Sequence, residues 1–299
     1  NISRGRVEKM AGIKSIDILT NSANNDKDVY WLSEVFNENT KINKTNEMYL
    51  ARRINKLFND NNFLEATPLA YKSYMGTKKI FLKKPNIDDV KTPSFEEIVI
   101  NRRTTRNFNE NEKITISQLS YLLYYSYGIT GKIEDNAGNI KQYLRAAPSG
   151  GGLYPCEIYM IIKNVEGIER GLYHYNVKLH ALECLKEGDF TGKIRELSSY
   201  DTTLSKAQIV MFITAVFPRT LFKYGDRGYR FVLLDTGHLA QNLFLSSTAL
   251  GLGLFPCGGF YDDAINDFLQ VDGVTESVVY ELAIGAPLES SKELTERWR

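Results

Sequence analysis

The chain has 299 residues, of which 43% are hydrophobic and 12% aromatic, which is enough apolar material for a large buried core. Its 37 Lys and Arg residues nearly balance its 36 Asp and Glu residues, so the formal charge is only +1. With so small a net charge, the protein has no overall electrostatic field that would attract nucleic acid or an anionic membrane. Any anion-binding site must therefore be local.

Cysteine is rare and dispersed, and the three histidines complete no metal-ligand spacing with Cys156, Cys184 and Cys257. We therefore expect neither a metal site nor a disulfide framework, and we expect a reducing cytoplasm as the compartment. The longest apolar runs, such as 207–217, fall well below the roughly 20 residues that a membrane-spanning helix needs. No apolar h-region opens the sequence, so we expect no signal peptide.

Residues 1–90 are rich in Asn, Lys and Asp, and we interpret them as a partly helical accessory region. Its one strong helical pattern covers 47–58, where one face carries Leu50, Ile54, Leu57 and Phe58. The segment Thr-Pro-Ser-Phe-Glu-Glu at 92–97 then has the cap and the acidic first turn of a helix start. We place the domain boundary there, so that residues 91–299 form the main domain.

In the main domain, apolar residues recur at helical spacing over 114–127, which predicts a buried helix. The residues expected in its core face are Leu119, Leu122, Leu123, Ser126 and Tyr127. Short β-branched or aromatic segments bounded by turn residues predict strands at 157–163, 171–175, 207–217 and 276–284. Small residues interleaved with large ones over 229–250 suit a closely packed helix. Strands mixed with long helices indicate an α+β domain.

Three arginines and two threonines occupy 102–106, directly after a predicted helix. Guanidinium groups form bidentate, charge-assisted hydrogen bonds with phosphate, which a solvated lysine run does less specifically. A solvated basic loop is the alternative. The residues alone support the two interpretations equally.

Two glycine-rich segments could bring the backbone close to a flat ligand. Glycine lacks a Cβ, so the segments Pro-Ser-Gly-Gly-Gly at 148–152 and Pro-Cys-Gly-Gly at 256–259 could approach such a ligand and donate their amides to it. A flexible loop or a bulge is the alternative for the first segment. We do not interpret Cys257 as a nucleophile, because no histidine is visibly placed as its base and a lone cysteine in apolar surroundings is more often inert.

Lys223 and Tyr224 are adjacent in the segment that precedes the predicted long helix. A positive charge beside a phenol favours the phenolate, which would make Tyr224 a better base. A surface lysine beside a half-buried tyrosine is the alternative, and sequence chemistry alone favours it. We expect His174 and His180 in strands and His238 in the core face of the long helix, without a functional role.

Together these segments, from Arg102 to Pro287, resemble the flavin-dependent nitroreductase superfamily in their order. The specific similarity is to its SagB-type dehydrogenase branch, which contains the azoline oxidases of thiazole- and oxazole-modified peptide pathways. The resemblance rests on Arg-Arg-x-x-Arg at 102–106, on 147–155, on Gly-Leu-Tyr-His-Tyr at 171–175, and on 223–230 running into 237–243. The arginine motif is generic to the superfamily, whereas the last two blocks are distinctive of the branch.

The resemblance implies a nitroreductase-like α+β fold with a central, mainly antiparallel sheet flanked by helices, and a homodimer with FMN at the subunit interface. The residues that it assigns to the FMN phosphate and ribityl chain are Arg102, Arg103, Thr104 and Arg106. The glycine loop that would line the isoalloxazine from the partner subunit contains Pro148, Ser149, Gly150 and Gly151. In the segment Pro256, Cys257, Gly258 and Gly259, Gly258 would present its N–H to flavin N5. Arg297 or Arg299 could also reach the phosphate.

The reaction implied by the resemblance is the oxidation of a peptide thiazoline or oxazoline to the thiazole or oxazole, within peptide natural-product biosynthesis. Tyr224, assisted by Lys223, is the candidate base for the acidified ring Cα–H. The implied partners are the azoline-containing peptide and cyclodehydratase proteins. One alternative is a related flavin oxidoreductase that acts on a carrier-bound nonribosomal intermediate or reduces an activated alkene or nitro group. Another is a flavin-less scaffold subunit of a cyclodehydratase complex.

Overall fold

The structure is a computed structural model that describes residues 32–44, 46–60, 71–86, 91–134, 136, 138 and 140–288. The chain divides into two compact units, Asn1–Lys44 and Thr45–Arg299. Within the first unit, α2 (Leu32–Asn39) is a short helix with no buried side chain. The proposed domain boundary near residue 90 stays a prediction, and the described residues 71–86 pack on the sheet of the second unit.

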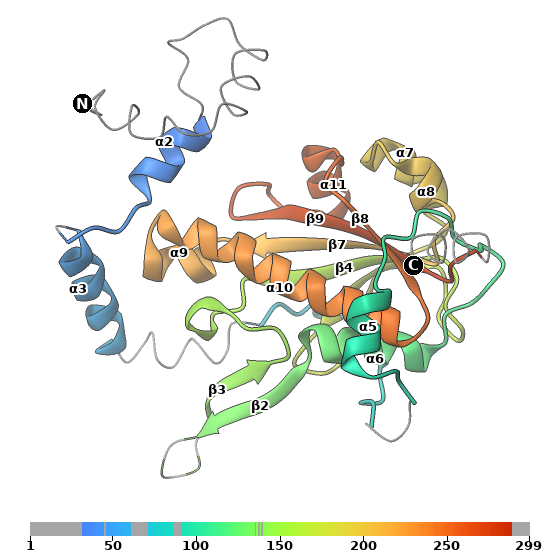
Figure 1. Ribbon diagram of the computed structural model, residues 1–299, viewed down its shortest axis with the longest axis horizontal. Coiled ribbons are helices and arrows are strands. Elements are labelled where there is room, and N and C mark those ends of the chain that lie inside the picture. Colours follow the sequence, from blue (N-terminus) through green and yellow to red (C-terminus); the bar gives the residue numbers. More distant parts are fainter. Residues whose placement is uncertain are drawn as a thin grey trace, which may run out of the picture. The chain divides into compact units, whose positions relative to one another are not determined.

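A seven-stranded sheet forms the centre of the second unit, in the order β1-β6-β5-β4-β7-β9-β8. Figure 1 labels its strands β4, β7, β9 and β8. Every neighbouring pair in it is antiparallel. Its strands are β1 (Lys79–Phe81), β4 (Cys156–Ile162), β5 (Gly171–Asn176), β6 (Ala181–Glu187), β7 (Ile209–Val216), β8 (Gly253–Cys257) and β9 (Glu276–Gly285). The central strands β4 and β7 are buried along nearly their whole length, which their continuous apolar runs allow. A separate hairpin pairs β2 (Ile129–Glu134) with β3 (Ile140–Arg145).

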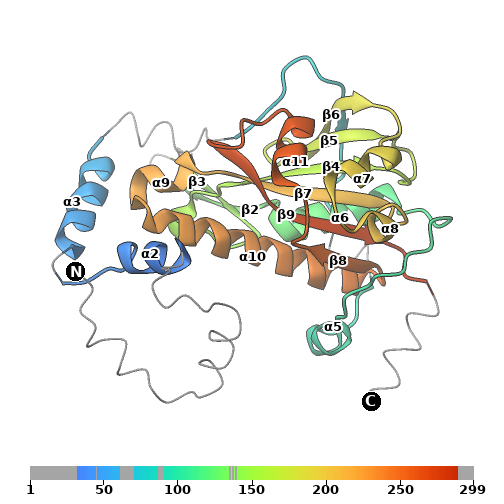
Figure 2. The same cartoon turned by 90° about the horizontal axis from the view of Figure 1, so that it is seen from above.

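Helices cover both faces of this sheet (Figure 2). One face packs against α6 (Ile116–Tyr127) and α10 (Arg227–Ala249). The opposite face packs against α7 (Ile194–Leu197), α8 (Asp201–Leu204) and α11 (Asp262–Leu269). Further helices, α5 (Phe95–Asn101) and α9 (Pro218–Tyr224), contact α10, and α3 (Glu47–Phe58) contacts α9. Over the described residues, no helix is both long and apolar enough to span a membrane.

Most of the predicted elements are confirmed. The predicted α+β class and mainly antiparallel sheet are correct, and α6 buries all five residues that were expected in its core face. The serine cap before α5 is a full capping box, in which Ser94 and Glu97 exchange side-chain-to-backbone hydrogen bonds. On α3, Leu50, Ile54 and Leu57 are the partly buried residues, as expected, while the side chain of Phe58 lies outside the described part of the chain.

Two histidine predictions are wrong. His180 lies in the turn between β5 and β6 with a φ of +48°, and not in a strand. Its ring bonds Ser120 and Tyr175, and these bonds hold it in that turn. His238 is on α10 as predicted, but it is exposed and not in the core face. Leu233 and Leu234, about one turn before His238 on α10, are exposed as well. The apolar residues of this stretch therefore do not mark the buried face of the helix.

A buried ionic network ties the strands β4, β5 and β6 together. The ring of His174 lies between two carboxylates, with Glu157 and Glu183 oxygens each 2.9 Å from a ring nitrogen. Burial opposes protonation of His174, but hydrogen bonds to the two carboxylates prevail and raise its pKa. We call residues 71–78 the strap. The strap docks on this network, because Ser73 Oγ (2.9 Å) and the Tyr74 N–H (3.1 Å) both donate to Glu183.

Candidate functional site

The arginine cluster begins where α5 ends and continues beside the edge strand β8. Thr104 forms a parallel bridge with Leu254, and the Thr105 N–H donates to the Leu254 carbonyl at 2.9 Å. Gly253 permits this close approach, because a Cβ there would lie 2.5 Å from the Thr105 side chain. The structure therefore brings the arginine cluster next to the glycine segment 256–259, which begins within the last two residues of β8.

The three arginines of the cluster differ in their surroundings. The guanidinium carbon of Arg102 lies 5.0 Å from the Phe244 ring centroid on α10, and that of Arg106 lies 5.6 Å from the Phe255 ring centroid on β8. In the described part of the chain neither has a carboxylate partner. Arg103 instead donates through Nη1 to the carbonyls of Ile100 and Arg102, both at 2.8 Å. Arg102 and Arg106 are thus the guanidiniums available to an anion.

The segment 256–259 contains a buried thiol and an open glycine. Burial, with a smaller contribution from the nearby Glu281, raises the pKa of Cys257 to about 11, which supports the interpretation of an inert thiol. A Cβ at Gly258 would meet no atom within 4 Å, so there is open space beside its backbone. The carbonyl of Gly259 accepts from the Ser199 N–H at 3.1 Å, which fixes the end of the segment.

Asp235 on α10 anchors the glycine loop that precedes β4. Its carboxylate accepts from Ser149 Oγ at 2.5 Å and from the Gly150 N–H at 3.2 Å, and Ser149 Oγ accepts in turn from the Tyr154 N–H at 2.8 Å. Sequence reasoning missed Asp235. The signal that could have found it is a lone carboxylate on an otherwise apolar stretch of the long helix.

Lys223 and Tyr224, at the end of α9, reach this same glycine loop. A Cβ at Gly151, whose φ is +68°, would lie 2.5 Å from Tyr224 Oη and 2.8 Å from Lys223 Nζ. Only glycine fits this position, because of its backbone conformation and because these two side-chain ends fill the space. The structure therefore brings together two segments of the sequence that are more than seventy residues apart.

The pKa shifts of this pair run opposite to those of a lysine-stabilised phenolate. Burial lowers the pKa of Lys223, which is only 6% exposed. Burial, followed by the charge of Asp235, raises the pKa of Tyr224. These directions run against the expectation that Lys223 makes Tyr224 a better base, because burial disfavours the charged form of both groups.

The predicted site residues form two groups at different levels of α10. Arg102 contacts the helix at Phe244, whereas the glycine loop contacts it at Asp235. Nine residues separate these positions, which corresponds to about 14 Å along a helix axis. One group offers an open glycine and two guanidiniums that have no carboxylate partner among the described residues, and the other offers an amine, a phenol and a tight glycine loop. Arg297 and Arg299 lie outside the described residues.

This fold and this set of residues define a recognised class of protein. Residues 99–286 match the model of the nitroreductase family, which is more than half of the chain, so the chain belongs to the nitroreductase family, as the sequence predicted. A nitroreductase-type protein from Anabaena variabilis has a similar structure, with a TM-score of 0.64 and 30% identity over 85% of this chain. This chain spans 46% of the length of that protein.

Particular relatives carry more specific names. The chain is 33% identical to the nitroreductase-type protein MJ1384 of Methanocaldococcus jannaschii, over 64% of this chain and 89% of the relative. It is 28% identical to the microcin B17-processing protein McbC of Escherichia coli, over 72% of this chain and 78% of McbC. It is 31% identical to the trifolitoxin-processing protein TfxB of Rhizobium leguminosarum bv. trifolii, over 56% of this chain and 46% of TfxB. A chain in the structure of the E. coli microcin synthetase McbBCD complex with truncated pro-MccB17 shares the fold, with a TM-score of 0.52 and 23% identity.

Proposed function

We propose that this protein is an FMN-dependent dehydrogenase that oxidises thiazoline or oxazoline rings of a peptide to thiazoles or oxazoles, in the biosynthesis of a peptide natural product. The observation that carries the proposal is the placement of Lys223 and Tyr224 against Gly151 of a glycine loop anchored by Asp235. The names of McbC and TfxB, which describe the processing of microcin B17 and trifolitoxin, support a peptide as the substrate.

The residues of the site fit FMN. Arg102 and Arg106 have no carboxylate partner among the described residues, and two such guanidiniums suit a phosphate. Open space beside Gly258 and the tight turn at Gly151 let the backbone approach a flat ring closely. FMN, when bound there, supplies the two-electron oxidant for the reaction. Arg103 contributes less in this proposal, because main-chain carbonyls already engage its guanidinium.

Aromatisation of an azoline removes one proton from the ring Cα and one hydrogen with its electron pair from the neighbouring ring carbon. The imine and the carbonyl that flank Cα acidify its proton, so that a modest base is enough. We place Lys223 as this base because its ammonium end lies against Gly151 of the glycine loop, and burial also lowers its pKa. Tyr224 keeps its proton and donates a hydrogen bond, since burial raises the pKa of its phenol.

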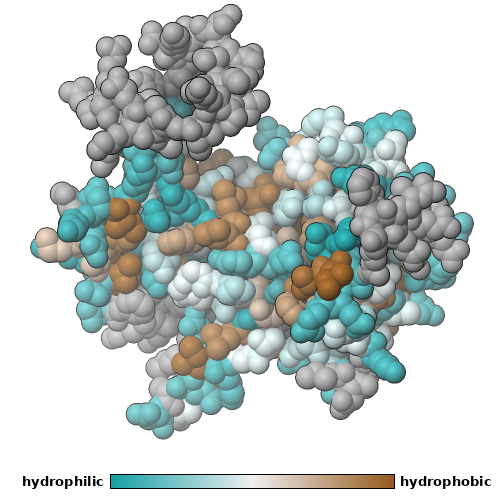
Figure 3. All heavy atoms as spheres, in the orientation of Figure 1, coloured by the Kyte–Doolittle hydropathy of each residue, from teal (hydrophilic) through white to brown (hydrophobic). Residues whose placement is uncertain are grey.

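A homodimer is part of the proposal, because each group of site residues is incomplete by itself. Large apolar side chains are exposed on α10 and α5, and Figure 3 shows apolar surface in the region of these helices. They include Leu233 (46% exposed), Leu234 (56%), Phe95 (67%) and Ile100 (60%). Burial of such a surface against a second copy would stabilise a dimer. The glycine loop of one subunit could then face the arginine cluster of the other.

Replacement of the catalytic pair tests the proposal. Lys223→Ala and Tyr224→Phe should keep FMN, because neither residue belongs to the proposed phosphate site. Both should oxidise an azoline-bearing peptide about 10²- to 10⁴-fold more slowly, which is the usual loss when acid–base catalysis is removed. The measurement is azole formation, followed by mass spectrometry as the loss of two hydrogens per ring. Lys206→Ala, on an exposed turn, is the control.

Two results would contradict the roles given to the pair. Unchanged rates in both variants would remove Lys223 and Tyr224 from catalysis, and loss of FMN in either variant would make that residue a cofactor contact. Wild-type protein that binds FMN but oxidises no azoline would favour the oxidoreductase that acts on a carrier-bound intermediate, an alkene or a nitro group. Wild-type protein that binds no FMN would favour the scaffold alternative.

A further inference from the structure

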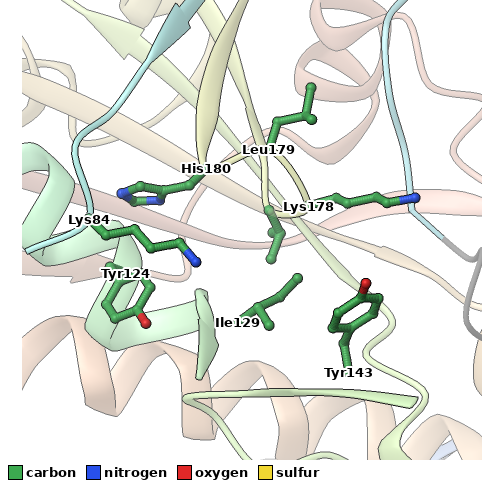
Figure 4. Close-up of a pocket in the computed structure, with 8 residues that line it drawn as sticks. Lys84, Tyr124, Ile129, Tyr143, Lys178, Leu179 and His180 are labelled. Carbon is green, nitrogen blue, oxygen red and sulfur yellow. The ribbon is translucent and has the colours of Figure 1, made fainter. Parts of the chain in front are cut away.

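A second cavity lies at the base of the β2–β3 hairpin, and none of its lining residues belongs to the site described above. We call it the hairpin pocket. It has a volume of about 230 Å³ and lies between the end of α6, the hairpin and the turn from β5 to β6 (Figure 4). The lining residues used in this argument are Lys84, Tyr124, Ile129, Tyr143, Lys178 and His180.

The charge at the hairpin pocket is positive. The ammonium groups of Lys84 and Lys178 each lie 5.9 Å from a tyrosine ring centroid, that of Tyr124 and that of Tyr71 respectively. Neither lysine has a carboxylate partner within the described ranges, and no lining side chain is acidic. The guanidinium carbon of Arg145 also lies near the Tyr71 ring, 5.2 Å from its centroid, and adds a third positive charge in the neighbourhood of Lys178. The pocket therefore attracts an anion.

The wall around His180 is neutral, and two hydrogen bonds orient its ring. The Nε2 atom of His180 lies 2.9 Å from Ser120 Oγ, and its Nδ1 atom lies 2.8 Å from Tyr175 Oη. Burial, followed by the charge of Lys84, lowers the pKa of His180 to about 4, so its ring is uncharged at neutral pH. The two lysines thus supply the charge that a ligand meets, and the remaining lining surface is mainly aromatic and aliphatic.

Size and chemistry together identify the class of ligand. A volume of about 230 Å³ is smaller than the roughly 300 to 1,000 Å³ of pockets that hold whole drug-sized molecules, so a group the size of a side chain fits best. Lys84, whose ammonium points toward the middle of the pocket in Figure 4, would pair with a carboxylate, and Lys178, which extends away from the middle, would add positive charge at the rim. Ile129 and the tyrosine rings would contact apolar atoms next to the carboxylate. A glutamate or aspartate side chain with an apolar neighbour has this chemistry.

Strand β3 connects the hairpin pocket to the glycine loop. Tyr143 lines the pocket, and the preceding residue, Gln142, points to the opposite face of the strand and donates through Nε2 to the Gly152 carbonyl at 2.9 Å. We propose that the hairpin pocket binds an acidic side chain of the peptide substrate, at a distance from the ring that is oxidised. The identity of the ligand as part of the substrate rests on the proposed function.

Direct binding tests this inference without turnover. The probe is a short fluorescein-labelled peptide with one glutamate between two leucines, titrated with the full chain and followed by fluorescence anisotropy. Replacement of both lysines, Lys84→Ala with Lys178→Ala, should weaken binding about tenfold or more, because charged hydrogen bonds are lost. The matched peptide with glutamine in place of glutamate should bind the wild type about tenfold more weakly. Lys83→Ala is the control, since Lys83 neighbours Lys84 but does not line the pocket.

The inference is overturned if the wild-type chain does not bind the acidic peptide, if the glutamine peptide binds equally well, or if the double variant binds as tightly as the wild type. A kinetic comparison then separates this inference from the proposed function. On an azoline peptide that carries the glutamate, the double variant should raise KM and leave kcat unchanged, and a small azoline without an acid should react normally. If the wild type oxidises no azoline at all, the proposed function fails, but the anisotropy comparison still decides the pocket.

Discussion

Arg102, Arg103 and Arg106 occupy five consecutive positions with two threonines, yet their guanidiniums have different contacts. Those of Arg102 and Arg106 lie over the Phe244 and Phe255 rings, whereas Arg103 donates to main-chain carbonyls at the end of α5. From the sequence, all three arginines are expected to bind the FMN phosphate and ribityl chain. The structure separates them, because the direction of a side chain after a helix end depends on the neighbouring strand and on α10.

Single replacements of these arginines should therefore differ in their effect on FMN. Arg102→Ala and Arg106→Ala should each weaken FMN binding about 10- to 100-fold, because a charged hydrogen bond is worth about 1.5 to 3 kcal/mol. Arg103→Ala is the matched control and should change affinity by less than about threefold. Titration of FMN, followed by the quenching of its fluorescence, measures the three affinities. Equal losses in all three variants would show that Arg103 also binds the phosphate.

Glu281 is a fully buried acid beside the 256–259 segment. One of its oxygens accepts from Ser198 Oγ at 2.7 Å, and the other has no hydrogen-bond partner among the described residues. Burial raises its pKa to about 7, from an ordinary value near 4.5. The folded protein thus binds a proton that the unfolded chain has already released in this range. Stability is therefore lost as the pH rises from about 4.5 through about 7.

Glu281→Gln should remove this pH dependence, because the amide stays neutral. Between pH 5 and pH 8 the wild type should lose up to about 3 kcal/mol of unfolding free energy relative to the variant, since a tenfold change in proton affinity is worth about 1.4 kcal/mol. Urea denaturation of both proteins at the two pH values measures the difference. Parallel pH profiles for the two proteins would mean that Glu281 does not titrate on unfolding.

At the scale of elements, the sequence predicted the strands that consist mainly of apolar residues. The apolar, β-branched segments of β4 and β7 identify them as strands, and the period of α6 identifies its buried face. Strand β6 was missed because it contains charged residues, among them Glu183, which is buried only because His174, Lys79 and the strap neutralise it. Strand β8 was missed because Pro256 and its glycines are typical of a loop, yet β8 is an edge strand, where proline is tolerated.

The same distinction applies to the candidate site. Its segments were found from local motifs, and the structure brings them together as two groups. Asp235, which holds the glycine loop, was not found. Its hydrogen bond with Ser149 joins residues 86 positions apart, and no local sequence pattern indicates such a contact. The pKa directions of Lys223 and Tyr224 were missed for a related reason. Adjacent charged residues are visible in a sequence, whereas the burial that sets these pKa directions depends on how α9 packs.

At the scale of the whole molecule, the exposed apolar faces of α10 and α5 lead to a prediction about assembly. If a homodimer buries these faces and completes the FMN site, thermal stability should rise with protein concentration and with added FMN. Sedimentation velocity at micromolar concentration should show a dimer. Leu234→Glu, which places a charge on this surface, should give a folded monomer that binds FMN weakly. Wild-type protein that sediments as a monomer and still holds FMN tightly would contradict the shared site.

The strap and the buried histidine have a consequence for how sequences of this kind can diverge. Loss of either carboxylate beside His174 would leave a buried charge without its partner, at a cost of about 3 to 5 kcal/mol, so single substitutions at these positions are rarely tolerated. Substitution of the whole trio by apolar residues would leave Arg219 and Lys79 without their carboxylates, and it would also remove the acceptor that holds Ser73 and Tyr74. The trio and the strap should therefore be inherited together, as a linked set of positions, in relatives that keep this sheet.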